Sequence, residues 1–363
     1  MADTEPNPAR ETALDQLLAP PTGTWVIDHD ATSLSFSLHS FGMRTRGRFG
    51  SMNITIAGPE GALQTRAVRR AYGRGMAKAV RNAHLDPETD YLRIYRELGE
   101  YEFPWDLTQS LSFALFRTYA VPSIGRLLDE THEFAERTQQ RYDDTALLLE
   151  EVTVHGFDSP SGREALRRIN GMHRMYDIAA DDMRYVLATF VVVPKRWIDR
   201  YGWRALTDRE LTASVRYYQA LGRHMGITDI PETYEAFAAL MDGYEAERFA
   251  FDAGGRRVAD ATLALLTTFY PRPLAPAVRL FSRALMDPPL LAAFGYREPG
   301  PLARRLSEGA LRARARLVRR LPPRRRPMLV RDMARIKSYP DGFDVRAMGT
   351  FAPGCPVHQR ASA

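Results

Sequence analysis

Apolar residues recur every three or four positions through most of the chain after residue 64, which is the spacing of amphipathic helices. Ser123–Val154 carries this pattern without a break and is predicted to be one long helix. Met183–Val193 is apolar on every side, so we expect it in the middle of the fold, with Pro194 ending it. The pattern predicts a mainly α protein, with one large all-α domain preceded by a short β segment.

The helix predicted at Ser161–Tyr176 places one histidine on an otherwise apolar face. Ser161 is a natural N-cap, and Glu164 can complete a capping box with it. Four side chains then share one face by their spacing: Leu166, Ile169, His173 and Tyr176. The simpler interpretation is a core histidine bonded to a carbonyl oxygen. The functional interpretation is that His173 is an iron ligand, since haem iron binds a neutral imidazole held where water is excluded.

A second stripe lies on the long predicted helix and is polar only in its middle. Its members follow the helical spacing: Phe134, Thr138, Arg141, Thr145, Leu148 and Val152. An inward arginine is costly unless an anionic group meets it. One interpretation is an internal ion pair of Arg141 with Asp143, Asp144 or a carboxylate on a neighbouring helix. The other is that Arg141 and Thr145 project as donors into a pocket between two helices.

The β segment predicted before the helical region is short. Leucine or phenylalanine alternates with serine through Leu34–Leu38, which predicts a half-buried strand. Further strands are predicted at residues 25–27 and 53–57, the second after a turn at residues 47–50. An isolated hairpin is marginally stable in water, and two or three strands cannot enclose a ligand.

Two short sequence motifs within this segment resemble those of a known family. Residues 23–36, reading Gly-Thr-Trp-Val-Ile-Asp-His-Asp-Ala-Thr-Ser-Leu-Ser-Phe, and Gly47-Arg-Phe-Gly50 resemble the opening strands of the YceI family. That resemblance implies β-barrels that hold isoprenoid lipids. Here it covers fewer than forty residues, at about 22–57, and so indicates a truncated remnant that does not bind lipid alone.

These patterns divide the chain into five parts. They are a disordered N-terminus (1–20), the short β segment (21–60), a basic, alanine-rich connecting helix (61–84), the helical domain (85–350) and a flexible tail (351–363).

The cysteine content and the hydropathy of the chain bear on its cellular location. The single cysteine, Cys355, excludes an intramolecular disulfide and a cysteine-based metal cluster. Residues 1–18 lack a basic start followed by an apolar run, so no signal peptide is expected. The most apolar run, Tyr185–Val193, is too short to span a bilayer. We expect a soluble, cytoplasmic protein, with peripheral contact to a membrane as a further option.

The positive charge of the chain is concentrated near its C-terminus. Arg304–Lys337 holds twelve arginines and one lysine against two carboxylates, a net charge of 13 − 2 = +11 in a chain whose total is +6. The arginine stems could simply cover apolar surface on a solvated helix. An anionic membrane surface is the second interpretation, and nucleic acid the third. No aromatic residues interleave the arginines, so no nucleic-acid partner is predicted.

Several long motifs of the helical region match those of one known family in the same order. They are Tyr101–Leu107, Ser112–Ile124, Arg141–Thr145, Ile169–His173, Asp181–Phe190, Arg196–Arg204, Gly222–Ile227, Tyr244–Glu247 and Tyr339–Phe343. With these motifs, which together cover roughly residues 86–349, the chain resembles the MpaB-type oxygenases and their relatives, the bacterial rubber oxygenases called latex clearing proteins.

This resemblance implies an all-α fold with a globin-like core and one haem b. It also implies cleavage of carbon–carbon double bonds of isoprenoid chains with molecular oxygen (O2). The family's axial histidine corresponds to His173, the metal ligand. Its Arg-x-x-x-Thr pair, on the distal side of the haem in the rubber oxygenases, corresponds to Arg141 and Thr145. The catalytic residues implied or proposed are therefore Arg141, Thr145 and Asp144, with Arg141 also facing the cofactor.

One position departs from the rubber oxygenases. They carry a lysine just before the threonine, where this chain has Asp144, so gating by that lysine does not carry over. Their catalytic glutamate has no match here. Asp144 is the best substitute base because it lies one residue from the stripe, and Glu102 and Asp106 are weaker candidates.

Three classes of function follow. The first is a haem-dependent oxygenase that acts on an unsaturated apolar chain, and the second is a haem protein that carries or senses oxygen without turnover. The third is a haem-free helical protein that binds lipids or isoprenoids. The sequence does not identify the substrate, the number of oxygen atoms transferred or the oligomeric state.

Overall fold

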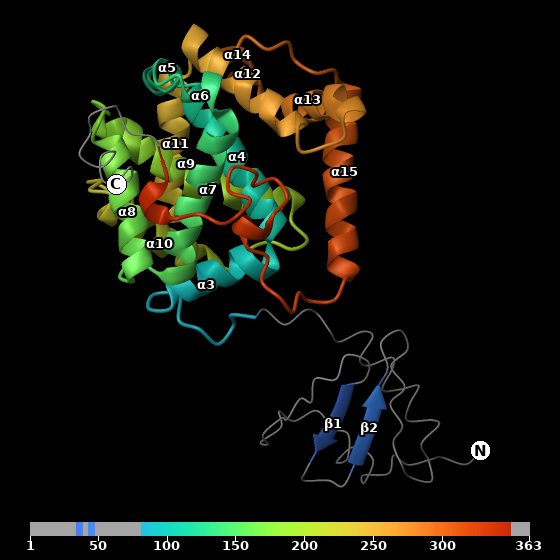
Figure 1. Ribbon diagram of the computed structural model, residues 1–363. Coiled ribbons are helices and arrows are strands. Elements are labelled where there is room, and N and C mark those ends of the chain that lie inside the picture. Colours follow the sequence, from blue (N-terminus) through green and yellow to red (C-terminus); the bar gives the residue numbers. More distant parts are fainter. Residues whose placement is uncertain (1–33, 39–42, 48–80, 350–363) are drawn as a thin grey trace. The chain divides into compact units, whose positions relative to one another are not determined.

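The computed structural model describes residues 34–38, 43–47 and 81–349 and divides the chain into two units, Met1–Ala79 and Val80–Ala363 (Figure 1). In the first unit, β1 (Leu34–Leu38) pairs antiparallel with β2 (Met43–Gly47). β1 confirms the strand predicted from alternation, whereas β2 was not predicted. The remaining predictions for residues 1–33, 48–80 and 350–363 lie outside the described residues.

The second unit confirms the prediction of a large all-α domain. Its helices are α3 (Tyr91–Glu97), a π-helical turn (Leu98–Glu102), α4 (Pro104–Tyr119), α5 (Pro122–Glu130), α6 (Glu133–Glu136), α7 (Thr138–His155), α8 (Pro160–His173), α9 (Ala180–Tyr201), α10 (Asp208–His224), α11 (Tyr234–Arg248), α12 (Ala253–Thr267), α13 (Ala275–Ala284), α14 (Pro288–Ala293) and α15 (Pro301–Arg320). Single 3-10 turns lie at Arg272–Leu274, Val330–Asp332 and Val345–Ala347. No helix in the described part of the chain is long and apolar enough to cross a membrane.

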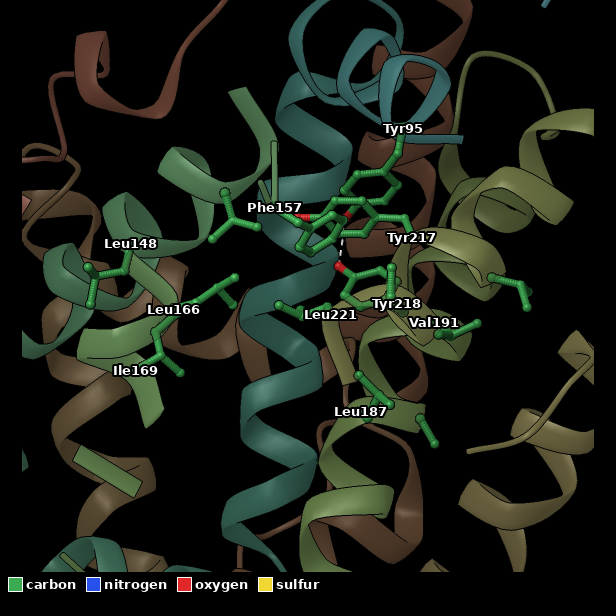
Figure 2. Close-up of a cluster of buried hydrophobic side chains, with 14 of the residues drawn as sticks. Tyr95, Leu148, Phe157, Leu166, Ile169, Leu187, Val191, Tyr217, Tyr218 and Leu221 are labelled. Atoms are coloured by element: carbon green, nitrogen blue, oxygen red, sulfur yellow. Dashed lines mark hydrogen bonds between the residues drawn. The ribbon is translucent and has the colours of Figure 1, made fainter. Parts of the chain in front are cut away.

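The largest core cluster joins α3, α7, α8, α9 and α10 (Figure 2). At its centre the rings of Tyr95 and Tyr217 stack with centroids 4.0 Å apart, and the hydroxyl of Tyr95 lies 2.6 Å from that of Tyr218. Thr153 on α7 lies 2.7 Å from the Tyr217 hydroxyl. Buried tyrosines need such partners, so the pairing fixes α3, α7 and α10 relative to one another.

The prediction of one helix over Ser123–Val154 is wrong, because the chain turns twice there. His132 adopts a left-handed conformation with φ of 60°, and α6 is a single short turn between α5 and α7. The turns let α5 pack on α12 and α7 pack on α8. The α5–α12 approach is close enough that a Cβ added to Gly125 would lie 2.7 Å from the Cα of Gly255.

Two predicted helix ends are also corrected. Pro194 lies inside α9, which continues to Tyr201. An internal proline costs a backbone hydrogen bond, but Trp197 and Ile198 beyond it are buried in a second cluster that stabilises the extension. The helix predicted to reach Tyr176 ends at His173, and Tyr176 is exposed.

The N-cap of α8 is Ser159 and not Ser161. The Ser159 hydroxyl accepts a hydrogen bond of 2.9 Å from the amide of Gly162, and Pro160 takes the first helical position, where proline is favoured. Ser161 instead donates to Glu151 on α7. A capping box begins α10, since Thr207 and Glu210 bond reciprocally.

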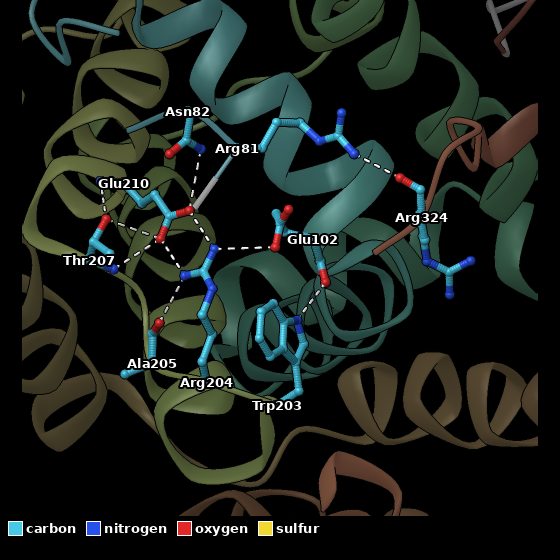
Figure 3. A network of polar contacts seen from close by, with 9 residues as sticks. All are labelled: Arg81, Asn82, Glu102, Trp203, Arg204, Ala205, Thr207, Glu210 and Arg324. Carbon is cyan, nitrogen blue, oxygen red and sulfur yellow. Dashed lines mark hydrogen bonds and ion pairs between the residues drawn. The ribbon is translucent and has the colours of Figure 1, made fainter. Parts of the chain in front are cut away.

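A largely buried polar network centres on Arg204 and Glu210 (Figure 3). Arg204 donates to both carboxylate oxygens of Glu210, at 2.6 and 2.7 Å, and to Glu102 at 3.4 Å. Glu210 is fully buried, and its pKa is lowered because hydrogen bonds from Arg204 and the Thr207 amide outweigh the effect of burial. The network holds the loop after α9 against the start of α10.

Candidate functional site

His173 is the last residue of α8 and lies partly buried behind the apolar face formed by Leu166 and Ile169. Its Nδ1 atom is buried and has no hydrogen-bond partner within the described residues. Burial, and secondarily the positive charge of Arg141, lower the pKa of His173 to about 4. The imidazole is therefore neutral near pH 7, with a nitrogen lone pair available to a ligand.

The other histidines of the described residues have a different environment. His84, His132, His155 and His224 are all exposed. Of these, His155 lies 3.5 Å from Glu151, and the ring of His224 stacks on Phe157 with centroids 4.9 Å apart. Among the histidines that the structure describes, His173 alone combines burial with an unpartnered ring nitrogen.

Arg141 on α7 points along the same helix to Thr145. Its Nη1 donates to the Thr145 hydroxyl, which in turn donates to the Arg141 carbonyl at 2.9 Å. The guanidinium lies 5.9 Å from the ring centroid of Phe134. Within the described residues no carboxylate lies within ion-pair distance of Arg141, so the ion pair that the sequence left open is not formed. A partly buried, uncompensated cation is costly unless a ligand meets it.

The two aspartates beside this stripe bind the C-terminal strap, which we define as residues 328–349. Asp143 accepts from the backbone amides of Lys337 and Ser338 at 3.0 and 2.9 Å. Asp144 accepts from the Tyr339 hydroxyl and from the Gly349 amide at 3.2 Å. Burial raises the pKa of Asp144, although the bond from Tyr339 and the charge of Arg141 oppose the shift.

The strap continues from Asp144 to the end of α8. Gly349 has a φ of +80°, and a Cβ there would lie 2.9 Å from the Met172 methyl group, so the strap packs on the residue just before His173. Arg168 Nε donates to the Met348 carbonyl at 2.8 Å. The strap therefore joins α7 and α8, the two helices that carry Arg141 and His173.

The weaker base candidates lie elsewhere and are already paired. Asp106, at the start of α4, accepts from Arg314 at 3.0 Å and from the Trp197 indole at 3.3 Å. Glu102 accepts a hydrogen bond from Arg204, as described above. The structure thus pairs Arg141 with Thr145 on α7 and places Arg141 close enough to His173 for its charge to act on the imidazole. Asp144 is one residue from Thr145 on α7, whereas Glu102 and Asp106 are bonded to other partners.

One residue near Arg141 was missed from the sequence. Tyr119, the last residue of α4, is buried, and its ring packs edge-on against Phe134 with centroids 5.5 Å apart. Burial raises its pKa to about 12, while the charge of Arg141 and a hydrogen bond with Thr262 oppose the shift. Tyr119 therefore stays protonated and can donate a hydrogen bond. A polar hydroxyl at the end of a densely apolar helix was the available signal.

A cavity of about 920 Å³ lies between α7, α8 and the strap. Both charged and apolar side chains line it, including Arg163, Arg346, Leu147 and Phe343. Its lining includes neither His173 nor Arg141, so this cavity is not the space between them.

His173 meets the requirement that a haem iron makes of the protein, which is a single neutral nitrogen ligand. In the described part of the chain no group of three or more histidine, cysteine, aspartate or glutamate side chains could hold a metal ion. The iron of a haem needs only one or two protein ligands, because the porphyrin supplies four. His173, neutral and with an unpartnered buried nitrogen, is suited to that single position.

Comparisons with known proteins show which families and structures this chain is similar to. Residues 104–320 match the family model "ER-bound oxygenase mpaB/B'/Rubber oxygenase, catalytic domain". The chain is 31% identical over 280 residues to the ER-bound oxygenase mpaB' of Penicillium brevicompactum, covering 72% of this chain and 66% of that protein. It is 32% identical over 222 residues to mpaB of the same organism, covering 56% of each.

The chain spans less than two thirds of the length of these two relatives. Among solved structures it is similar to latex clearing protein LCP in the closed state, with 17% identity, a TM-score of 0.42, and coverage of 75% of this chain and 76% of that one.

Proposed function

Because the chain belongs to the family of ER-bound oxygenases mpaB/B' and rubber oxygenases, we propose that it is a haem b-dependent oxygenase. Its substrate would be an unsaturated apolar chain of isoprenoid type, oxidised or cleaved with O2. The observation that best supports the haem is His173, whose buried Nδ1 has no partner and whose pKa is lowered to about 4. Haem iron binds a neutral imidazole nitrogen that is shielded from water.

Haem, when bound, would supply the iron that activates O2. His173 would hold it from the end of α8, and the burial of Ile169 and Leu166, one and two turns earlier, fixes this end of the helix. Because the imidazole is neutral near pH 7, no proton must leave before it can act as a ligand.

Arg141 and Thr145 would supply the polar side of the pocket. Arg141 has no carboxylate partner within the described residues, so its charge is available where negative charge develops on oxygen during the reaction. Thr145 keeps the guanidinium oriented by accepting from Nη1. Tyr119 can donate a further hydrogen bond, since its pKa of about 12 keeps it protonated.

Asp144 is the proposed proton acceptor. Burial raises its pKa and so makes its carboxylate a stronger base than an exposed aspartate. Its bond to Tyr339 means that this hydroxyl must move, or pass a proton through itself, before a substrate proton reaches the carboxylate. Removal of an allylic proton is the step that this residue would perform.

The visible spectrum of the purified protein, with haem supplied during expression or added afterwards, tests the proposal first. We expect a Soret band, and oxygen uptake when farnesyl or geranylgeranyl compounds are added. A Soret band without oxygen uptake on any such compound would indicate a haem protein that carries or senses oxygen. Absence of a Soret band after haem addition would remove both haem functions and favour a haem-free helical protein that binds lipids or isoprenoids.

A membrane surface is the proposed place of action. The relatives mpaB and mpaB' are named ER-bound oxygenases, and the substrate class proposed here partitions into lipid. We propose that the protein is cytoplasmic and meets its substrate there by peripheral contact.

A further inference from the structure

Exposed leucines lie along α15 and at the residue that follows it, and we call this set the leucine stripe. Its members are Leu302, Leu306, Leu317 and Leu321, with exposed fractions of 69, 64, 61 and 51%. Seven of the nine exposed large hydrophobic side chains in the described residues lie between Tyr270 and Leu321. Single exposed leucines need no explanation, but a cluster on one element marks an interaction surface.

Helical geometry places the four leucines on one face. Their separations are four, eleven and four residues, so at about 100° per residue they fall within an arc of about 100°. Leu311 and Ala315, which are buried, lie roughly opposite this arc. The helix therefore has two apolar faces, of which only one is covered by the rest of the domain.

Contacts on the covered face fix the orientation of α15. Arg314 donates to Asp106 at 3.0 Å, and its guanidinium lies 3.8 Å from the ring centroid of Trp105. α13 packs beside α15 at the edge of the domain (Figure 1). The leucine stripe cannot turn inward without breaking the buried ion pair, so it stays exposed to solvent.

Arginines flank the leucine stripe on one side. By the same geometry Arg305, Arg316 and Arg320 lie along its edge, all are exposed, and none has a carboxylate partner in the described part of the chain. Residues 301–326 carry ten arginines against Glu308 alone, a net charge of 10 − 1 = +9. Apolar side chains bordered by unpaired cations are complementary to a surface that is apolar below and anionic above.

We propose that α15 docks on a phospholipid bilayer that contains anionic lipids. The leucines would enter the boundary between headgroups and acyl chains, and the arginines would contact lipid phosphates. The helix lies in the plane of the interface, since its charged edge cannot enter the hydrocarbon. This surface extends the membrane location proposed above, and its docking does not depend on haem or oxygen.

Sedimentation of the full chain with vesicles tests this docking without measuring activity. Vesicles of phosphatidylcholine alone are compared with vesicles that also contain phosphatidylglycerol. We expect binding to the anionic vesicles that weakens as salt is raised, and weak binding to the neutral ones. Leu306→Ser combined with Leu317→Ser should lower binding about tenfold or more, because two apolar side chains that would enter the bilayer are lost. Phe251→Ser, at a residue 62% exposed elsewhere, should leave binding unchanged.

The arginines are tested in the same assay by a matched pair of triple variants. Arg305→Gln, Arg316→Gln and Arg320→Gln together should lower binding by tenfold or more, since each basic residue near an anionic surface is worth about 1 kcal/mol, or about fivefold. Arg163→Gln, Arg223→Gln and Arg346→Gln remove the same charge from exposed positions elsewhere and should have a small effect.

Three results would overturn the proposal. They are no sedimentation with anionic vesicles, equal binding to both vesicle types, and equal losses in the two arginine triples. Light scattering of the wild type and the leucine variant tests the alternative that a second copy of the chain binds the leucine stripe. A dimer that the leucine variant abolishes would assign the stripe to a second copy of the chain instead.

Discussion

Arg141 and His173 lie on neighbouring helices, yet the positive charge of Arg141 reaches the imidazole and contributes to the lowering of its pKa. Burial is the larger cause, and both effects favour the neutral ring. The same guanidinium also acts on Tyr119 and Asp144. One unpaired cation thus acts on three titratable groups, and together with burial it keeps the imidazole neutral.

Replacement of His173 by alanine should abolish haem binding. The protein should fold, because the residue lies at a helix end, but its Soret band should be absent or strongly reduced. His224→Ala, at an exposed histidine, is the control and should keep the band. Added imidazole should restore part of the spectrum in the His173 variant. An unchanged Soret band in His173→Ala would assign the iron to another residue.

Arg141→Met should retain haem and reduce oxygen uptake by about 100-fold or more, the range seen when one preorganised donor is removed. Its stability should stay within about 1 kcal/mol of the wild type, because no carboxylate of the described residues loses a partner. Urea unfolding and oxygen uptake measure the two effects separately. An unchanged rate would remove Arg141 from the mechanism.

Arg117→Met is the contrasting variant. Arg117 donates to Glu245 and Asp287, each at 2.6 Å, and Tyr185 donates to the same Glu245 at 3.0 Å. Its removal leaves buried Glu245 uncompensated and should cost about 3–5 kcal/mol. If both arginine variants lost stability equally, Arg141 would have a counterion that the structure does not describe.

Local patterns predicted the helical content because capping residues and apolar spacing within each helix are visible in the sequence. The capping box of Thr207 and Glu210 and the apolar spacing of α8 are examples. The break at His132 gave no such signal, since no glycine or proline marks it. The turn accompanies the close packing of α5 on α12 at Gly125 and Gly255, and such long-range contacts do not show in a local pattern.

The candidate site was predictable in part for the same reason. Helical spacing placed Arg141 and Thr145 on one stripe and His173 on one face, and the resemblance joined the two. The roles of Asp143, Asp144 and Tyr339 in holding the strap could not be predicted, because their partners lie about 195 residues apart in the chain. Pro194 shows the converse, where buried contacts beyond it overrule a strong local signal.

Asp144→Asn and Asp143→Asn separate the chemical role of Asp144 from its structural one. Each variant removes from α7 a charged acceptor that binds the strap. Both variants should therefore make the strap more accessible to proteolysis at Arg335 or Lys337. Only Asp144→Asn should also lower oxygen uptake, by about 100-fold or more for loss of a general base. Equal activity losses in the two variants would mean that Asp144 acts only by holding the strap.

The stability of the apoprotein should depend on pH through His173. The pKa of this ring is about 4 in the folded state and 6.5 as its ordinary value, so below pH 6.5 the unfolded chain binds a proton that the folded chain does not. Stability is therefore full above about pH 6.5 and falls as the pH drops toward 4. Between pH 7 and 5 the loss should be about 1–2 kcal/mol. Urea unfolding of His173→Gln should lack this component, whereas His224→Gln should keep it. Parallel curves for all three proteins would mean that the imidazole is solvated and titrates normally.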